Sequence, residues 1–219
     1  DFSRPRANGI NAITIQEGDQ LLDVSLTDGN SYIMMAVRSG RAICFEETKV
    51  RTTGRGAIGV FGIELDEKND EVIGMICVSQ DNSDKQILVV SEKGLGKRTP
   101  FLELNEENGQ MEPTYRITNR GGKGVKTINI TEKTGALVGL LAVNEKDDLM
   151  ITCKSGITIR MKVEHIREAG RATQGVKLIN LDEGDEIAAI ARIDEQDEEG
   201  NELENGETGD ATLDTPITE

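Results

Sequence analysis

The sequence predicts an all-β protein, a propeller-like array of four-stranded antiparallel blades. Three observations lead to this prediction. Short runs rich in Val, Ile and Leu have the length of strands and lie between acidic or glycine-containing turns. Three pairs of such runs flank a short turn that contains glycine, as the two strands of a β-hairpin do. A basic, glycine-containing segment recurs four times, and a period near 50 residues is typical of propeller blades.

Four repeat segments carry the recurrence, and their aligned glycines are 50, 65 and 51 residues apart. The repeat segments are RPRANGINAITI at 4–15, RTTGRGAIGVFGIEL at 51–65, RITNRGGKGVKTINI at 116–130 and REAGRATQGVKLINL at 167–181. The aligned glycines are Gly9, Gly59, Gly124 and Gly175. Glycine allows a tight turn and a close approach of the backbone, and the residues that follow it alternate like a strand. We therefore expect each repeat segment to be a loop followed by a strand.

Further strands are expected between the repeat segments. After each repeat segment an acidic turn leads into an apolar run, and these runs lie at 17–26, 70–78, 135–143 and 183–193. Three hairpins are expected at 32–45, 86–99 and 149–161, with Gly40, Gly94 and Gly156 in their turns. A loop or a single helical turn, as in VEHIREAGR, would then lead into the next repeat segment. Each unit would thus hold about four strands.

The order of these elements predicts about four blades in residues 1–193, arranged as an open arc. Three units are complete, whereas the last one stops before any hairpin. Terminal units of a repeat array lack a neighbour, so we expect them to be weak. The long return at 101–117 contains an acidic insertion of about 11 residues, which we expect to form a surface loop.

The negative charge is concentrated at the C-terminal end. The formal net charge is -15, but residues 194–219 contain eleven acids and no base, whereas residues 1–193 hold 25 bases against 29 acids. Residues 194–219 have no aromatic side chain and few apolar ones, so we expect a disordered acidic tail that competes with any polyanion for the basic residues of the body.

Several classes of function are disfavoured. The apolar runs are too short to span a membrane, and three isolated cysteines indicate core thiols in a cytoplasmic protein rather than disulfides or a metal site. GGKGVKT at 121–127 lacks the spacing of a nucleotide-binding P-loop. The single histidine, His165, has no Ser or Cys motif near it, and Asp147 and Asp148 fall in a turn. We therefore predict a chain with no catalytic residue, no metal and no cofactor.

Basic residues that recur by position are the remaining signal. Those in the repeat segments are Arg4, Arg6, Arg51, Arg55, Arg116, Arg120, Lys123, Lys126, Arg167, Arg171 and Lys177. Those that follow the hairpin glycines are Arg41, Lys97, Arg98 and Arg160. Stacking of the units would align them along one edge as a stripe that contacts phosphates. Without interleaved aromatic residues or a recognition helix, the stripe favours the backbone of double-stranded DNA. A propeller-like protein-interaction scaffold, whose rim charges serve solubility, is the alternative.

The repeat phrases are similar to a known family. SRPRANGINAI, GKRT, NRGGKGVKTINITEKTG and GRATQGVKLINL resemble the repeats in the C-terminal domain of the bacterial DNA gyrase A subunit, over essentially all of residues 1–193. The resemblance implies a β-pinwheel of four-stranded blades, six in most gyrases, which wraps duplex DNA around a basic rim. It also implies a nucleoid-associated, non-catalytic part of an ATP-dependent type II topoisomerase that introduces negative supercoils. The implied partners are double-stranded DNA, the gyrase B subunit, and the remainder of the gyrase A subunit.

The chain departs from the family at one motif. The basic box of the family reads Gln-Arg-Arg-Gly-Gly-Lys-Gly and lies in its first blade, whereas only RGGKG at 120–124 matches here, after Thr118 and Asn119. By count the chain corresponds to about the last four blades and the tail. The resemblance therefore implies retained DNA binding and does not extend to strong wrapping. The C-terminal domain of topoisomerase IV, which also lacks the box, is the nearest alternative, although the strict repeat phrases favour gyrase.

Overall fold

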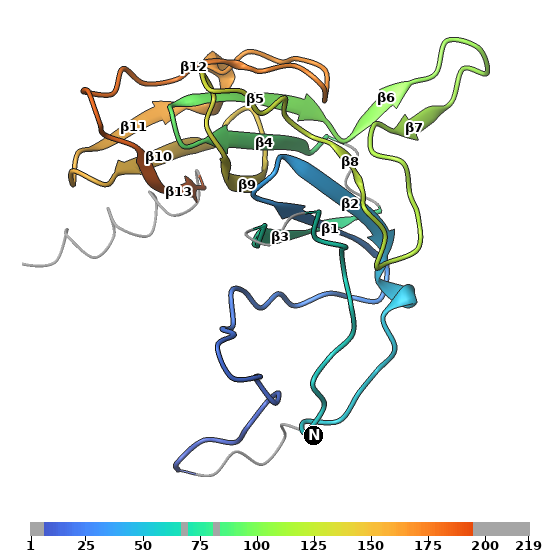
Figure 1. The fold of residues 1–219 in the computed structure, drawn as a ribbon. Coiled ribbons are helices and arrows are strands. Elements are labelled where there is room, and N and C mark those ends of the chain that lie inside the picture. The colour runs from blue at the N-terminus through green and yellow to red at the C-terminus, as the bar shows by residue number, and fades with distance from the viewer. Residues whose placement is uncertain (1–6, 67–69, 81–83, 195–219) are drawn as a thin grey trace, which may run out of the picture.

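Short antiparallel strands make up nearly all the regular structure of this chain. The computed structural model describes residues 7–66, 70–80 and 84–194, and within them it has thirteen strands and two 3-10 turns (Figure 1). The 3-10 turns are η1, Glu47–Lys49, and η2, Val163–His165. The turn η2 lies in the segment where a single helical turn was predicted, and that prediction is confirmed.

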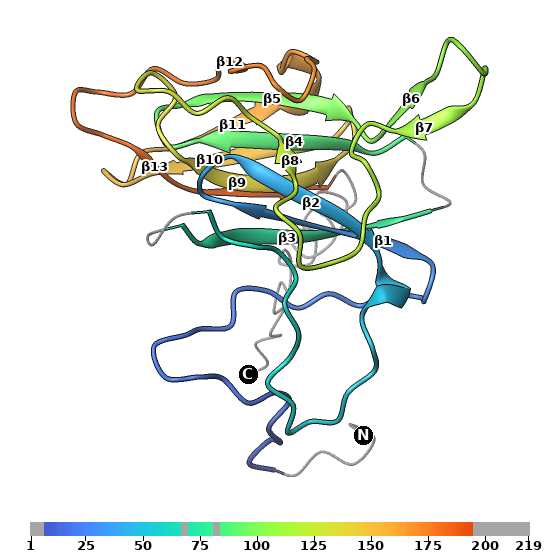
Figure 2. The ribbon, with the colours of Figure 1, turned by 45° about the vertical axis from the view of Figure 1, so that its right-hand side comes forward.

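Three sheets follow one another along the molecule (Figures 1 and 2). The first sheet has the order β3 (Val72–Ser79), β1 (Ser31–Val37), β2 (Arg41–Glu46) and β8 (Val125–Lys126). The second sheet has the order β9 (Leu137–Val143), β4 (Gln86–Ser91), β5 (Leu95–Pro100) and β12 (Val176–Lys177). The third sheet has the order β13 (Ile187–Ile193), β10 (Asp148–Cys153) and β11 (Thr158–Lys162). The all-β, propeller-like architecture is therefore as predicted.

The centre of each sheet is a hairpin with a glycine in its turn. The pairs β1–β2, β4–β5 and β10–β11 are antiparallel, and they are the three hairpins predicted from the sequence. Gly40, Gly94 and Gly156 have φ angles of 82°, 80° and 91°, which side chains rarely adopt. The third strand of each sheet, β3, β9 or β13, comes from the apolar run that follows the hairpin.

The fourth strand of a sheet comes from a distant part of the chain. Val125 of β8 pairs with Ala42 of β2, and Val176 of β12 pairs with Gly96 of β5. A complete hairpin and a complete apolar run separate the two partners in each case. The expectation that each unit holds four strands of its own is therefore wrong, because a repeat segment completes the sheet of an earlier hairpin.

The sheets stack through apolar side chains. Met34 and Val78 of the first sheet pack with Ile87 and Val89 of the second in one buried cluster. Leu88 and Val90 of the second sheet belong to a further buried cluster. That cluster also contains Leu149, Ile151 and Ile187 of the third sheet. The strands β3, β9 and β13 contact one another in succession. Each face of the second sheet is therefore covered by a neighbouring sheet.

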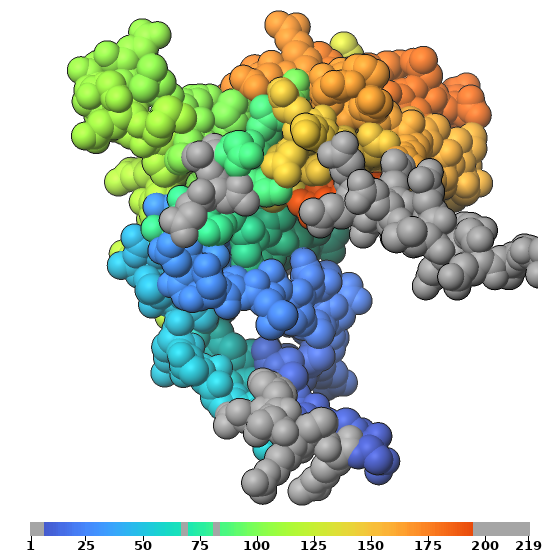
Figure 3. Space-filling model, turned by 180° about the vertical axis from the view of Figure 1, so that it is seen from behind, coloured from blue at the N-terminus to red at the C-terminus, as the bar shows by residue number. Residues whose placement is uncertain are grey.

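The first unit has no sheet of its own. Residues 7–30 and 50–66 contain no strand, and the strand expected at 17–26 is not formed there. Figure 3 shows these two stretches as a slender extension beside the sheets, with an opening between them. Several of their large apolar side chains are exposed, among them Leu26 at 99% and Phe61 at 85%. The predicted four blades are thus two four-stranded sheets, one three-stranded sheet and an open first unit, and no sheet among the described residues joins the first unit to the last.

The remaining predictions concern the periphery. The acidic insertion forms a hairpin of β6, Leu102–Leu104, and β7, Met111–Pro113, that projects from the sheets (Figure 1). The predicted acidic tail lies outside the described residues, apart from Asp194. The three cysteines are free, and burial raises the pKa of Cys44 to about 12. In the part of the chain that the structure describes, no helix has the length and apolar character needed to cross a membrane.

Candidate nucleic-acid interface

The third repeat segment lies along β2 of the first sheet and supplies the outermost strand, β8. The Thr127 N–H donates to Gly40 O over 2.9 Å, and the Thr118 N–H donates to Cys44 O over 2.9 Å. Between these contacts the backbone comes very close to β2, because a Cβ at Gly124 would lie 2.3 Å from Ala42 O. Gly124 also has a φ of +68°. The aligned glycine is therefore required at this position for two independent reasons.

The fourth repeat segment repeats this geometry on the second sheet. The Leu178 N–H donates to Gly94 O over 2.8 Å, and the Ala169 N–H donates to Arg98 O over 2.9 Å. A Cβ at Gly175, where φ is +78°, would lie 2.5 Å from Gly96 O. Equivalent residues of the two repeat segments thus occupy equivalent places on β2 and β5, and the two loops are carried at the same edge of successive sheets.

Successive repeat segments are joined by a recurring backbone hydrogen bond. The amide five residues after the aligned glycine donates to the carbonyl two residues before the glycine of the next segment. The three bonds are Thr14 N to Ala57 O at 3.0 Å, Glu64 N to Gly122 O at 2.9 Å and Asn129 N to Thr173 O at 3.1 Å. All four repeat segments therefore lie side by side in one continuous row, although only the last two have a strand.

Two arginines connect neighbouring repeat segments. Arg120 donates from Nη1 to Phe61 O over 3.0 Å and from Nε to Lys49 O over 3.1 Å. Arg171, at the equivalent position of the next segment, donates from Nη1 to Lys126 O over 3.4 Å. These bonds hold each guanidinium over the row and leave both side chains part-exposed. Arg55 is the equivalent residue of the second repeat segment, and it is exposed.

Most of the predicted basic residues reach the surface. Arg51, Arg55, Arg116, Lys123, Lys126, Arg160, Arg167 and Lys177 are exposed. Arg41, Arg120 and Arg171 are half-buried. Arg4 and Arg6 lie outside the described residues. Seven of the eight exposed residues belong to the row of repeat segments, whereas Arg160 lies on the uncovered strand β11 and pairs with Asp148 over 2.6 Å. The structure therefore brings together the predicted residues of the repeat segments that it describes, but not all of those after the hairpin glycines.

Lys97 is corrected from a surface contact to a structural residue. Its side chain is fully buried beneath the fourth repeat segment, and Nζ donates to the carbonyls of Gly170 and Arg171 and to Thr173 Oγ1. Burial lowers the pKa of Lys97 to about 8, and the nearby Arg171 charge acts in the same direction. The sequence reasoning missed that a repeat segment from a later unit covers β5.

Arg98 is corrected in the same way. Its side chain is buried, and its guanidinium donates to Ile166 O over 2.6 Å and to Gln86 Oε1 over 2.8 Å. It also pairs with Glu145 over 2.7 Å. Arg98 thus holds the chain that leads into the fourth repeat segment, and neither of the two cations on β5 is presented to a ligand in solution.

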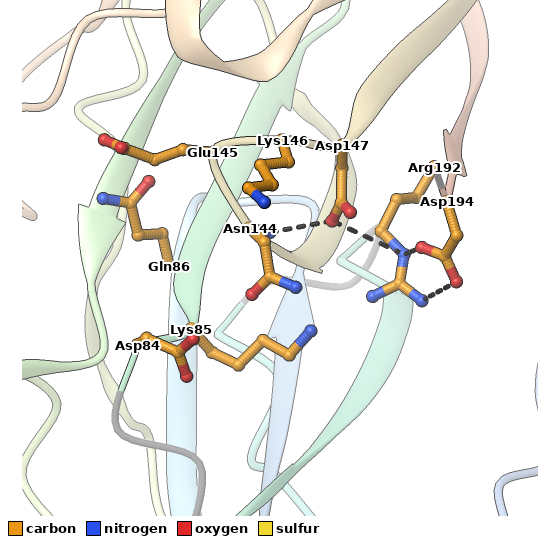
Figure 4. A pocket seen from close by; sticks show the side chains of 9 residues that line it. All are labelled: Asp84, Lys85, Gln86, Asn144, Glu145, Lys146, Asp147, Arg192 and Asp194. Atoms are coloured by element: carbon orange, nitrogen blue, oxygen red, sulfur yellow. Dashed lines mark hydrogen bonds and ion pairs between the residues drawn. The ribbon is translucent and has the colours of Figure 1, made fainter. Parts of the chain in front are cut away.

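A pocket between the second and third sheets offers no comparable phosphate site. It has a volume of about 740 Å³, and Figure 4 shows Asp147 in it accepting a bond from the Asn144 N–H and facing Arg192. Its lining residues are Asp84, Lys85, Gln86, Asn144, Glu145, Lys146, Asp147, Arg192 and Asp194. The lining charges are mixed and Arg192 is paired with acids. Within the described ranges no group of His, Cys, Asp or Glu is placed to hold a metal ion.

Two further residues near the row were missed at the level of the sequence. Lys49 of η1 is exposed, and its carbonyl accepts the bond from Arg120 described above. Asp66 lies seven residues after Gly59 and pairs with Lys123 over 3.5 Å. Both residues are remote from the third repeat segment in sequence, so only the contact between successive segments reveals them.

Comparison with known proteins decides the family. The family model described as DNA gyrase C-terminal domain, beta-propeller, matches residues 1–28, 31–79, 85–106, 114–144 and 147–194. The chain belongs to the DNA gyrase C-terminal domain family. The family resemblance recognised from the repeat phrases is therefore confirmed.

Relatives in the DNA gyrase family agree with this assignment. The DNA gyrase A subunit of Staphylococcus epidermidis is 38% identical over 198 residues, which cover 90% of this chain and 21% of that protein. The DNA gyrase A subunit of Staphylococcus aureus is 41% identical over 204 residues, which cover 93% of this chain and 22% of that protein. The chain thus spans about a fifth of the length of these relatives.

Solved structures show the same fold. The DNA gyrase A C-terminal domain superposes with a TM-score of 0.70 at 23% identity, covering 85% of this chain and 58% of that one. The C-terminal domain of DNA topoisomerase IV superposes with a TM-score of 0.77 at 20% identity, covering 94% of this chain and 61% of that one. At these identities the likeness establishes the propeller-like fold.

Proposed function

We propose that this chain is a non-catalytic module of DNA gyrase that binds and bends double-stranded DNA. The contacts are to backbone phosphates along the row of repeat segments. The contributing residues are Arg51, Arg55, Arg116, Arg120, Lys126, Arg167, Arg171 and Lys177, with Lys123 and Arg41 in the centre of the row. Arg4 and Arg6, which lie outside the described residues, are included from their sequence positions alone. Family membership supports the class of partner, and the geometry of the row supports the mode of binding.

The observation that carries the proposal is the hydrogen bond that recurs between successive repeat segments. It places the loops of four segments next to one another, which supports one continuous ligand for basic residues that are 50 or more residues apart in sequence. Duplex DNA offers such a ligand, with one negative charge per about 1.7 Å of its axis. Contacts to phosphates position a duplex without reading its bases. We infer the bending from the family resemblance, which implies that duplex DNA is wrapped around a basic rim.

The role of the whole enzyme belongs to the same proposal. The relatives are named as the A subunit of DNA gyrase, and this chain spans about a fifth of each. We infer that it works with the gyrase B subunit, and with the remainder of the gyrase A subunit, on chromosomal DNA in the bacterial cytoplasm. Bending by this module would present a nearby DNA segment to the ATP-dependent strand passage that those parts carry out, and so support negative supercoiling.

The test is the salt dependence of DNA binding by the 219-residue chain and by a triple variant. Arg55→Gln, Arg120→Gln and Arg171→Gln together should weaken binding to a duplex at every sequence tried. They should also reduce the slope of log K against log salt by about 2 to 3, because each lost phosphate contact removes about 0.9. Thermal unfolding measured by circular dichroism checks that the variant is folded.

The matched control neutralises three cations that lie outside the repeat segments. Lys93→Gln, Lys146→Gln and Lys154→Gln change the net charge equally, and these residues belong to hairpin turns or to the β9–β10 turn. They should leave the salt slope nearly unchanged. Binding that is absent or independent of salt would reject the proposal and favour a protein-interaction scaffold. Equal effects of the two triple variants would reject the row as the contact surface.

A further inference from the structure

The row of repeat segments contains one compact cluster of opposite charges. It lies where the second repeat segment meets the third. Asp66 lies 3.5 Å from Arg41 Nε through Oδ2 and 3.5 Å from Lys123 Nζ through Oδ1. Glu64 lies 3.9 Å from the same Lys123 Nζ. Two of the predicted phosphate contacts are therefore paired with acids of the chain itself.

These charges are not needed to join two repeat segments. At the next junction the residues equivalent to Asp66 and Lys123 are Thr131 and Gln174, which form an uncharged contact of 3.3 Å. The residues equivalent to Glu64 and Arg41 there are Asn129 and Leu95. The backbone bond between segments is nevertheless present at both junctions. The charged cluster is thus an addition to a junction that forms without it.

The cluster is open to solvent, so it can be displaced. The Lys123 and Glu64 side chains are 58% and 53% exposed, and Asp66 is 30% exposed. Ion pairs at such exposure are weak and are screened by salt. Arg41 is held more firmly, because it also donates to Lys123 O and Gly124 O over 2.9 Å each. A phosphate could therefore replace the acids beside Lys123 and Arg41 without disturbing the loop itself.

We propose that Asp66, assisted by Glu64, masks Lys123 and Arg41 from DNA phosphates and thereby sets how tightly the row holds a duplex. This inference rests on the proposed DNA-binding function. Lys123 and Arg41 contact phosphates only after the acids are displaced, so the affinity for DNA is lower than these two basic residues would otherwise give. Asp66 would then be an affinity-setting residue that opposes binding.

Asp66→Asn tests the proposal directly. It should tighten binding to a duplex about three- to tenfold near 100 mM salt. The slope of log K against log salt should become steeper by about 1 to 2, because one or two basic side chains, Lys123 and Arg41, become available to phosphates. Adding Lys123→Gln to Asp66→Asn should cancel most of the gain, because Lys123→Gln should weaken binding more in the Asp66→Asn background than in the unaltered chain.

Asp182→Asn is the matched control. Asp182 occupies the position of Asp66 in the fourth repeat segment, and it is exposed. The substitution changes the net charge equally but unmasks neither Lys123 nor Arg41, so we expect less than a twofold effect. Equal tightening by both variants, or an unchanged slope with Asp66→Asn, would overturn the masking proposal while leaving the proposed function intact. Absence of salt-dependent binding in the unaltered chain would instead remove the proposed function itself.

Discussion

The first two repeat segments and the last two have similar sequences but different structures. In all four the aligned glycine has a positive φ, between +68° and +107°. At Gly124 and Gly175 an added Cβ would meet the backbone of β2 or β5, whereas at Gly9 and Gly59 nothing lies within 4 Å. The last two segments form strands and the first two do not. All four segments thus share the backbone conformation at the aligned glycine, but only the last two have a neighbouring strand to pair with.

This difference shows what makes a repeat segment into a strand. The third segment pairs with the hairpin β1–β2, and the fourth pairs with the hairpin β4–β5. No hairpin among the described residues stands in the same relation to the first or second segment, and apolar side chains such as Ile13, Ile58 and Phe61 stay exposed there, although Ile63 is buried. Strand formation here depends on an edge supplied by an earlier unit rather than on the sequence of the segment alone.

The largest effect is expected from substituting the aligned glycine by alanine. Gly124→Ala should lower the free energy of unfolding by about 4 kcal/mol, because it combines an unfavourable φ with a clash against Ala42 O. Gly59→Ala has the unfavourable φ but open space, so it should cost only about 1 to 2 kcal/mol. Urea unfolding of the two variants measures both values.

Equal losses in these two variants would contradict the comparison. They would mean that the second repeat segment also packs against the strand of a hairpin in solution, as the third segment packs against β2. Gly9→Ala provides a further control, since Gly9 has a φ of +73° with nothing near it.

A second test uses the buried cation beneath the fourth segment. The pKa of Lys97 is about 8 in the folded chain, against an ordinary 10.5. Between these pH values the unfolded chain binds more protons than the folded one, so stability should rise with pH in this window. Relative to Lys97→Met, the unaltered chain should gain about 3 kcal/mol between pH 8 and pH 10.5. Urea unfolding of both proteins at pH 7, 8, 9, 10 and 10.5 measures the gain.

Lys97→Met places an apolar side chain at a position that is already apolar in the first sheet, where Ile43 is the residue equivalent to Lys97. Burial raises the pKa of Cys44 and of Tyr115 to about 12, and these groups oppose the trend at high pH. They are present in both proteins and cancel in the difference. A difference that stays constant with pH would show that Lys97 is not held in a desolvated site.

The smallest test compares equivalent arginines. Arg120→Gln removes the hydrogen bonds to Phe61 O and Lys49 O, so it should lower the free energy of unfolding by about 1 kcal/mol. Arg55→Gln affects an exposed residue of the second segment and should change it by less than about 0.5 kcal/mol. Thermal unfolding monitored by circular dichroism would measure both effects. A larger loss of stability for Arg55→Gln than for Arg120→Gln would show that the second segment, not the third, depends on its arginine.

Much of the fold could be predicted because its signals are local. The hairpin turns at Gly40, Gly94 and Gly156 need only a glycine between two apolar runs. The strands β8 and β12 begin directly after aligned glycines, where a strand was expected, although each has only two residues. Their partners β2 and β5 could not be predicted, because they belong to distant parts of the chain. The strand expected at 17–26 failed for the related reason that an apolar run becomes a strand only beside a suitable edge.

The candidate site was predictable to the same extent. Bases in the repeat segments, such as Arg55 and Lys126, are exposed as their position in a charged loop suggested. Lys97 and Arg98 were misplaced because their own hairpin gave no sign of the segment that covers them. The pairing of Lys123 with Asp66 was likewise hidden, since it depends on how two segments meet.

The exchange of strands between units also has a consequence for synthesis of the chain. During synthesis, the edge of β2 stays unpaired after Ala42 is made until Val125 is made. The edge of β5 likewise stays unpaired from Gly96 until Val176. At about 5 to 20 residues per second, these intervals last roughly 4 to 16 s. An unpaired edge can meanwhile pair with another chain, and charged side chains oppose such pairing. We expect Lys97 and Arg98 to guard the nascent edge of β5 before the fourth repeat segment arrives and buries them.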